Sequence, residues 1–149
     1  MKNVILCLCS VFVLSSFLFP CDEECVKERM SLACEEGDFR ACLRVGDIYL
    51  TGQGSKYNFV LAQFLYEKAF DIVKEKCSQK STEHCIALGV FYEVGKGTVQ
   101  NVDEAAYIFH NLCNEGVCEG CNNLFRLKDE LLLTDESQYF QCEEKYYTF

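Results

Sequence analysis

The chain has 149 residues, half of them hydrophobic, with a single proline and a formal net charge of −9. This length suits one domain with a core of its own. The acidic balance argues against DNA or RNA as a partner, because a polyanion would be repelled. Twelve cysteines are far above ordinary usage and indicate a disulfide scaffold in an oxidising compartment.

The N-terminus supports that compartment. Lys2 precedes an apolar run over residues 4–19, which is short for a bilayer span of about 20 residues. A secretory signal peptide over residues 1–20 is the favoured interpretation, and an uncleaved anchor is the alternative. We therefore expect a secreted or periplasmic protein that has no membrane contact once the signal is removed.

A helix–turn–helix unit is predicted over residues 85–113. Apolar and small residues recur at helical spacing on both sides of the turn Gly95-Lys-Gly97, and Asn101 stands where a helix cap is expected. The segment that starts at Cys42 carries matching residues in the same register without a gap. Such a fixed period marks a repeat architecture. The first helix of each unit is called helix A below, and the second helix B.

The mature chain is predicted to be a single α/α repeat domain over residues 21–149. Its parts are an N-terminal half repeat at 22–34, with Asp22 as the cap of a lone helix B, repeat 1 at 42–77, repeat 2 at 85–113 and a C-terminal cap at 121–149. In repeat 1 the cysteine that ends helix B comes seven residues late, at Cys77. Seven residues are close to two helical turns, so we expect a longer helix B. The alternative is an enlarged loop from Asp71 to Lys80.

Three cysteine pairs share the spacing Cys-x7-Cys, each running from the end of one helix B into the next helix A. Two antiparallel helices joined by a short loop can bring such residues to bridging distance. Metal binding is the alternative, but zinc sites favour closer pairs such as C-x2-C. The predicted disulfides are Cys34–Cys42, Cys77–Cys85 and Cys113–Cys121.

Four further cysteines of the mature chain allow three pairings. Cys21–Cys25 with Cys118–Cys142 is preferred, because each pair is expected to lie close together in a stacked array. The alternative is a zinc site in a reducing compartment, formed by Cys113, Cys118, Cys121 and Cys142. In the oxidising compartment no metal and no cofactor is expected.

The register C-x2-L-G-x2-Y-x2-G-x-G-x8-A resembles the Sel-one-like repeat, a relative of the tetratricopeptide repeat. The C-x7-C link is similar to that of the Helicobacter cysteine-rich protein family of secreted repeat proteins. The resemblance covers roughly Asp22 to Leu124 and implies an all-α, right-handed solenoid of helix hairpins with disulfides between repeats. Members are described as penicillin-binding proteins with β-lactamase activity and as secreted factors that interact with host cells.

The residues themselves show no catalytic motif. The chain lacks the S-x-x-K arrangement of a serine β-lactamase. Its two histidines, His84 and His110, are too few for a typical metallo-enzyme, and each is interpreted as a surface or partly buried side chain. Whether the protein is an enzyme stays open on the sequence.

Two functional hypotheses follow. The resemblance implies binding and slow hydrolysis of β-lactams, with peptidoglycan fragments as related ligands. The other hypothesis is a non-catalytic module that binds a protein or peptide of the host or the cell envelope on a concave surface formed by helices A. Arginines there could bind a carboxylate of either kind of ligand. The candidate ligand-binding residues, chosen because they lie off the core register, are Arg40, Arg44, Asp47 and Arg126.

Overall fold

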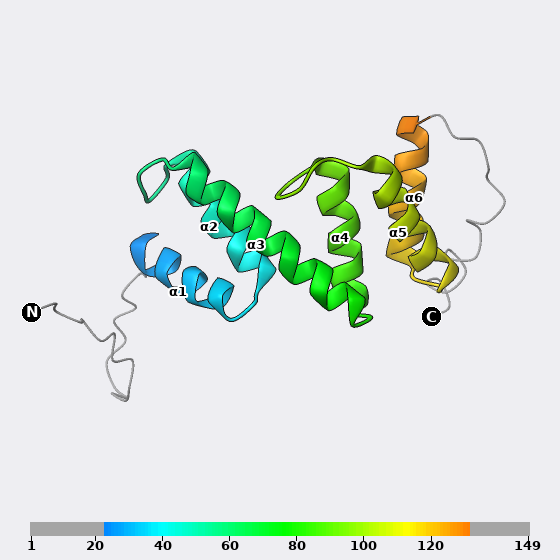
Figure 1. Cartoon of the computed structure of the whole chain (residues 1–149), viewed down its shortest axis with the longest axis horizontal. Helices are drawn as coiled ribbons and strands as arrows, with labels where there is room; N and C mark the ends of the chain where they lie inside the picture. Colours follow the sequence, from blue (N-terminus) through cyan, green and yellow to red (C-terminus); the bar gives the residue numbers. More distant parts are fainter. Residues whose placement is uncertain (1–22, 132–149) are drawn as a thin grey trace, which may run out of the picture.

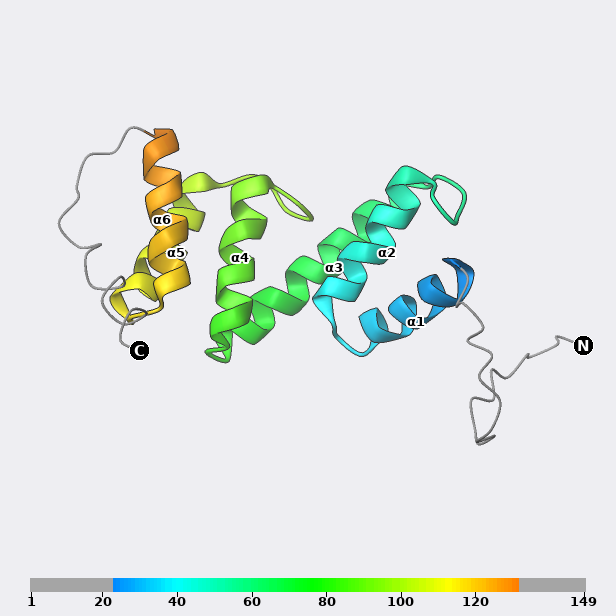
Figure 2. The ribbon, with the colours of Figure 1, turned by 180° about the vertical axis from the view of Figure 1, so that it is seen from behind.

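The computed structural model describes residues 23–131, which form α-helices and, within that range, no β-strand (Figure 1). Each helix packs against its neighbours in chain order, and the front and back views show the same linear array (Figures 1 and 2). The prediction of an all-α array of helix hairpins is therefore confirmed. The helices are α1 (Glu23–Glu35), α2 (Phe39–Thr51), α3 (Phe59–Ser78), α4 (Thr82–Val94), α5 (Val102–Asn114) and α6 (Cys118–Leu131).

Some predictions fall outside the described residues. They are the signal peptide over residues 1–20, the capping role of Asp22 and the part of the C-terminal cap after residue 131. The two cysteines Cys21 and Cys142 lie there as well.

The turn residues of the repeat set the helix ends. The side chains of Asn58 and Asn101 cap α3 and α5, accepting hydrogen bonds from the backbone N–H groups of Leu61 and Glu104 at 3.0 and 3.1 Å. Gly52 and Gly95 end α2 and α4 with φ angles of 73° and 67°, a left-handed conformation that glycine adopts without steric cost.

Helix α3 has 20 residues, whereas α2, α4 and α5 have 13 each. The prediction of a helix B that is longer by two turns is thus confirmed, and the alternative of an enlarged loop over residues 71–80 is wrong. The Nζ of Lys76, in the last turn of α3, donates a hydrogen bond to the carbonyl of Gly37 at 3.0 Å. The added turns therefore reach back to the loop between α1 and α2.

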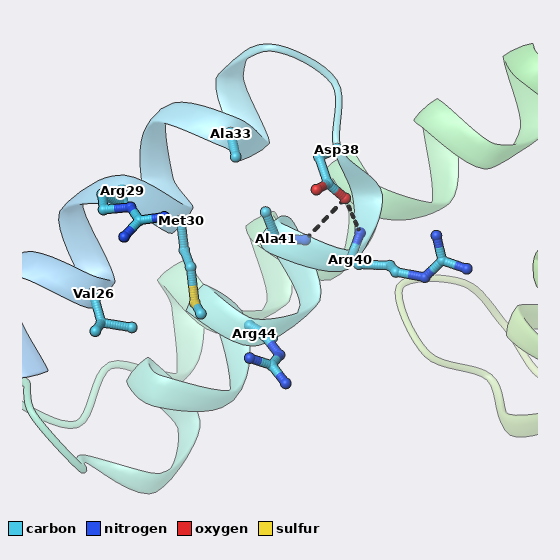
Figure 3. A pocket seen from close by; sticks show the side chains of 8 residues that line it. All are labelled: Val26, Arg29, Met30, Ala33, Asp38, Arg40, Ala41 and Arg44. Carbon is cyan, nitrogen blue, oxygen red and sulfur yellow. Dashed lines mark hydrogen bonds between the residues drawn. The ribbon is translucent and has the colours of Figure 1, made fainter.

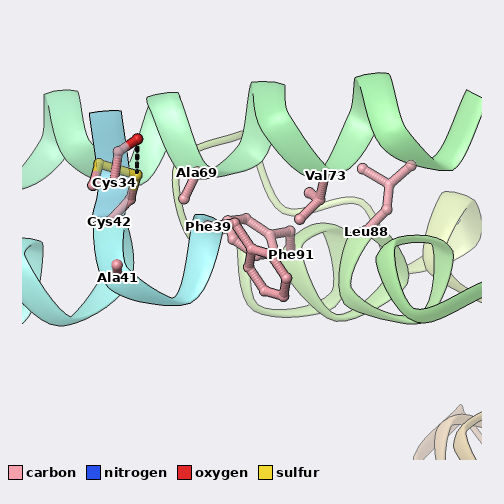
Figure 4. Close-up of a cluster of buried hydrophobic side chains, with 8 residues drawn as sticks. All are labelled: Cys34, Phe39, Ala41, Cys42, Ala69, Val73, Leu88 and Phe91. Atoms are coloured by element: carbon pink, nitrogen blue, oxygen red, sulfur yellow. Dashed lines mark hydrogen bonds between the residues drawn. A yellow bond between two sulfur atoms is a disulfide. The ribbon is translucent and has the colours of Figure 1, made fainter. Parts of the chain in front are cut away.

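Disulfides join successive repeats as predicted. The bonds Cys34–Cys42, Cys77–Cys85 and Cys113–Cys121 have Cα–Cα distances of 4.6, 4.6 and 4.5 Å, and the first is drawn in Figure 4. Because Cys113 and Cys121 are bonded to each other, the zinc alternative that used both is wrong. Cys25 is also disulfide-bonded. The pairings Cys21–Cys25 and Cys118–Cys142 stay predictions, since each includes a cysteine outside the described range.

Over residues 23–131 the hydrophobic core has two clusters. The first joins α1, α2, α3 and α4, with the rings of Phe39 and Phe91 at its centre (Figure 4). The second joins α5 and α6 around Phe109, which is fully buried. In both repeats a glycine of helix A lies against an aromatic ring of helix B. A Cβ added at Gly46 would come within 2.5 Å of the Tyr66 ring, and one at Gly89 within 2.5 Å of the Phe109 ring.

Candidate functional site

Helices α2, α4 and α6 hold the helix A positions, and their exposed surface is called the helix A face. Ion pairs connect its members. Arg40 on α2 pairs with Glu83 on α4, and Arg126 on α6 pairs with Glu93 on α4, with a second contact at 2.7 Å. Three of the predicted site residues, Arg40, Asp47 and Arg126, are thus exposed on this face, and each is held by a side chain of a neighbouring repeat.

Asp47 belongs to a polar cluster between repeats 1 and 2. Its Oδ1 accepts hydrogen bonds from the hydroxyl of Tyr66 at 2.6 Å and from the Nζ of Lys96 at 2.8 Å. The Lys96 ammonium also lies 4.4 Å from the centre of the Tyr66 ring, a cation–π distance. Lys96 belongs to the glycine turn of repeat 2, so the cluster fixes that turn on repeat 1.

The pKa values of the two acidic groups in this cluster, Asp47 and Tyr66, shift in opposite directions. Partial burial pushes the pKa of Asp47 upward, but the hydrogen bonds from Lys96 and Tyr66 and the charge of Lys96 outweigh it, so the pKa lies below its ordinary value. Burial, followed by the hydrogen bond and charge of Asp47, raises the pKa of Tyr66. Asp47 is therefore ionised and Tyr66 neutral at physiological pH.

A groove lies on the helix A face between α2 and α4, close to the start of α6. Its volume is about 320 Å³, and it is called the helix A groove. The floor is apolar, with Leu43 from α2 and Ile86 and Val90 from α4, while Arg40, Glu83 and Glu119 supply charges at its edges. Apolar floors with a few placed polar groups are typical of binding sites.

Arg44 lies apart from the helix A groove. It lines a second cavity, of about 400 Å³, between α1 and α2 (Figure 3). Arg40 borders both cavities. The structure therefore brings Arg40 and Arg44 to one cavity, whereas Asp47 and Arg126 line neither.

A serine–histidine pair was missed by the sequence analysis. The Oγ of Ser81 and the Nδ1 of His84 are 2.7 Å apart, and the imidazole packs at a steep angle against the ring of Phe39, with ring centres 5.3 Å apart. Ser81 precedes α4 at the N-cap position but makes no side-chain cap bond to the helix backbone. The signal in the sequence was S-x-x-H at a helix start, a spacing that brings the first and fourth side chains together.

Over residues 23–131 no group of three or more histidine, cysteine, aspartate or glutamate side chains has the arrangement of a metal site. The same part of the chain contains no helix with the length and apolar character needed to cross a bilayer.

Comparison with known proteins supports the repeat assignment. The Sel1 repeat family model matches residues 39–71 and 85–117, which contain α2 with most of α3, and most of α4 with α5. No curated protein sequence matches the chain.

Two solved structures are similar. A Sel1 repeat protein from Oxalobacter formigenes is 22% identical, with a TM-score of 0.41, and the match covers 73% of this chain and 43% of that one. Helicobacter pylori cysteine rich protein B is 29% identical, with a TM-score of 0.37, over 64% of this chain and 67% of that one.

Together the matched repeats and the disulfides between them define a cysteine-rich α/α solenoid. The chain contains two Sel1 repeats, as the resemblance implied, and disulfides join the successive helix hairpins. Arrays of this class present extended surfaces for protein interaction.

Proposed function

We propose that the protein is a non-catalytic interaction module that works outside the reducing cytosol, secreted or in the periplasm, and binds a protein or peptide in the helix A groove. The three inter-repeat disulfides support the oxidising compartment. The observation that carries the binding role is the apolar floor of the groove, bordered by charges on two neighbouring helices.

The groove has the chemistry for binding a peptide. Val90 is 37% exposed, so apolar surface is available for a ligand side chain to bury. The side chains of Arg40 and Glu83 are 64% and 53% exposed, so their unused hydrogen-bonding positions are open to a peptide main chain. Their mutual pairing limits the freedom of both side chains before the ligand arrives, which reduces the entropy lost on binding.

Selection from a displayed library of random peptides on the oxidised protein tests this proposal. Peptides enriched on the wild-type chain are expected to lose at least tenfold in affinity for Val90→Asp, because the new carboxylate would be buried under the ligand. Tyr107→Asp is the matched control, since Tyr107 is a 63% exposed side chain on the helix B α5. Peptides that bind both variants and the wild type equally would exclude the helix A groove as the binding site.

Binding and slow hydrolysis of β-lactams, implied by the family resemblance, is the second candidate. The observation that favours it is the 2.7 Å contact between Ser81 and His84, because an imidazole at hydrogen-bond distance can take the proton of an attacking serine hydroxyl. A peptidoglycan fragment would be the related natural ligand.

A nitrocefin assay separates the candidates. Turnover by the oxidised protein that disappears in Ser81→Ala and in His84→Ala would establish the serine–histidine reaction. The non-catalytic proposal instead expects no turnover above a heat-inactivated control.

A further inference from the structure

The N-terminal helix α1 lies at an open end of the described array. α1 has the position of a helix B. The other two such helices, α3 and α5, each pack between two helices A, whereas α1 packs substantially against α2 alone among the helices of residues 23–131. Figures 1 and 2 show α1 alongside α2, at the end of the array away from α6. Within residues 23–131, one side of α1 therefore has no helix over it, whereas the same side of α3 and of α5 is covered.

The cavity on that side is called the N-terminal groove. Its volume is about 400 Å³. The floor of the groove is formed on the α1 side by Val26, Met30 and Ala33, whose spacing of four and three residues places them on one face of the helix. Ala41 of α2 completes the floor. In Figure 3 the side chain of Met30 extends from α1 toward α2. All three α1 residues are only partly buried, so apolar surface remains for a ligand to cover.

The charges available in this groove are positive. Arg29 from α1 and Arg44 from α2 line it, and neither guanidinium forms a hydrogen bond or ion pair with any residue in the described part of the chain. Arg40 is engaged by Glu83, and Figure 3 shows its guanidinium turned away from α1. The carboxylate of Asp38 is engaged as the cap of α2, accepting from the N–H groups of residues 40 and 41.

This pair of arginines stands out on a chain of net charge −9. The acidic residues Glu24 and Glu28 of α1 do not line the groove. A ligand that combined carboxylates with an apolar stripe would match both the rim and the floor, because arginine pairs with carboxylates through parallel hydrogen bonds.

We propose that the N-terminal groove binds an acidic amphipathic helix of a partner protein. A helix is the fitting occupant because a helix A takes the equivalent place beside α3 and α5. Its apolar residues would lie on Val26 and Met30, and carboxylates on its flanks would pair with Arg29 and Arg44. This surface is separate from the helix A groove, so it adds a second contact to the proposed interaction module.

Synthetic peptides test the proposal on the oxidised full chain. The probe is a labelled 14-residue peptide with leucines at helical i, i+3, i+4, i+7 spacing, glutamates beside them and alanines elsewhere. Matched probes replace every glutamate by glutamine or by lysine. Fluorescence anisotropy at about 0.15 M salt is expected to show the glutamate probe binding at least tenfold more tightly than the glutamine probe, a difference of about 1.4 kcal/mol.

Charge reversal identifies the groove. Arg29→Glu and Arg44→Glu are each expected to weaken binding of the glutamate probe by fivefold to tenfold and to strengthen binding of the lysine probe. Lys56→Glu is the matched control, because Lys56 is an exposed residue in the turn after α2 and lines neither groove. Lys56→Glu should bind all three probes with wild-type affinity. Because it changes the net charge as much as Arg29→Glu or Arg44→Glu does, it also shows how much of any effect comes from net charge alone.

Several results would overturn the proposal. One is equal affinity for the glutamate and glutamine probes, another is no binding up to about 1 mM, and a third is an effect of Arg44→Glu no larger than that of Lys56→Glu. Loss of glutamate-probe binding in Val90→Asp would move the contact to the helix A groove and leave the proposed function intact. A wild-type dimer that Arg44→Glu converts to a monomer would assign the groove to a second copy of this chain instead.

Discussion

Lys80 occupies a backbone position that favours glycine. The three loops from a helix B to the next helix A have a left-handed residue at the third place after the first cysteine. These residues are Gly37, Lys80 and Gly116, with φ angles of 91°, 64° and 82°. A side chain in this conformation costs about 1 kcal/mol, whereas glycine adopts it freely. Repeat 1 therefore tolerates local strain in its loop that the other two loops avoid.

Replacing Lys80 by glycine should stabilise the protein. We expect the free energy of unfolding to rise by about 0.5–1 kcal/mol, somewhat less than the strain removed, because glycine also makes the unfolded chain more flexible. Urea denaturation of the oxidised protein measures the change.

The reciprocal variant Gly116→Lys is the control. This variant should lower the free energy of unfolding by about 1 kcal/mol. The cost comes from backbone conformation alone, because a Cβ at Gly116 would meet no atom within 4 Å. Neutral results for both variants would contradict the strain argument.

At the residue scale the sequence predicted which side chains are exposed to solvent, but not which side chains they pair with. Arg40, Asp47 and Arg126 were chosen because they fall off the apolar register, and the structure places all three at the surface. Their ion-pair partners lie 43, 49 and 33 residues away in the chain, on elements of a neighbouring repeat. A helical period describes one element at a time, so it carries no information about such contacts.

At the scale of elements, the glycine turn of repeat 2 is fixed against α3. A Cβ on Gly97 would overlap the carbonyl of Tyr66, so the turn lies directly on the backbone of the helix. Lys96 in the same turn reaches Asp47 and the Tyr66 ring. The close approach requires glycine, and the neighbouring polar cluster keeps the turn in place.

The stability contributed by this cluster should depend on pH. Because the pKa of Asp47 is lower in the folded protein than its ordinary value of about 3.9, the contribution is present above that pH and is lost as the pH falls through the folded pKa. Asp47→Asn should lower the free energy of unfolding by about 0.5–1 kcal/mol at pH 7, a small value because half of the Asp47 side chain is exposed.

Urea denaturation from pH 7 to pH 3 tests this dependence. The gap between the wild type and Asp47→Asn should close below about pH 4. Glu104→Gln serves as the matched control, because Glu104 is exposed on α5 and lies outside the cluster. A gap that keeps its size down to pH 3 would contradict the assignment of the contribution to the carboxylate.

The bounds of the elements were largely predictable. Asn58 and Asn101 as caps and Gly52 and Gly95 as helix ends follow from local backbone chemistry, which the sequence carries directly. The extension of α3 was predictable because a cysteine returned to the same face two turns later. The hydrogen bond from Lys76 to the loop before α2 could not be predicted, because it joins segments that only the folded array brings together.

For the molecule as a whole, stability comes from contacts between successive helices, and one disulfide links each pair of successive units. The bond Cys77–Cys85 connects α3 to α4, where the first core cluster also crosses from Val73 to Leu88 and Phe91. In such arrays stability is roughly a sum of repeat and interface contributions. A weakened junction is therefore expected to open before the units beside it.

The free energy of unfolding of Cys77→Ser/Cys85→Ser should be about 2–3 kcal/mol lower than that of the wild type. Without the disulfide the short loop is no longer closed in the unfolded chain, so the unfolded state gains conformational entropy. Hydrogen exchange by mass spectrometry should show the first loss of protection at the end of α3 and the start of α4. Cys34→Ser/Cys42→Ser is the matched control and should expose α1 while leaving the junction of α3 and α4 protected. Uniform loss of protection along the chain in both variants would contradict a stack of separable units.

The stacked architecture was predictable from the repeat period and the cysteine spacing, and the two grooves were not. The helix A groove combines α2, α4 and α6, and the N-terminal groove lies on the side of α1 that no other helix of residues 23–131 covers. Both arise from the order of packing in space. Arg44 was identified as a candidate from its register, but its place beside Arg29 became visible only with α1 and α2 in position.

The added turns of α3 shift the second hairpin along the first. At 1.5 Å per residue, seven residues displace α4 by about 10 Å relative to where a 13-residue helix would set it. The turn at Gly97 accordingly rests on Tyr66, one full heptad beyond the beginning of α3 at Phe59. Asp47 on α2 accordingly meets Lys96 in the turn beyond α4 rather than a residue of α4 itself, so the length of α3 sets which side chains of the two repeats face each other.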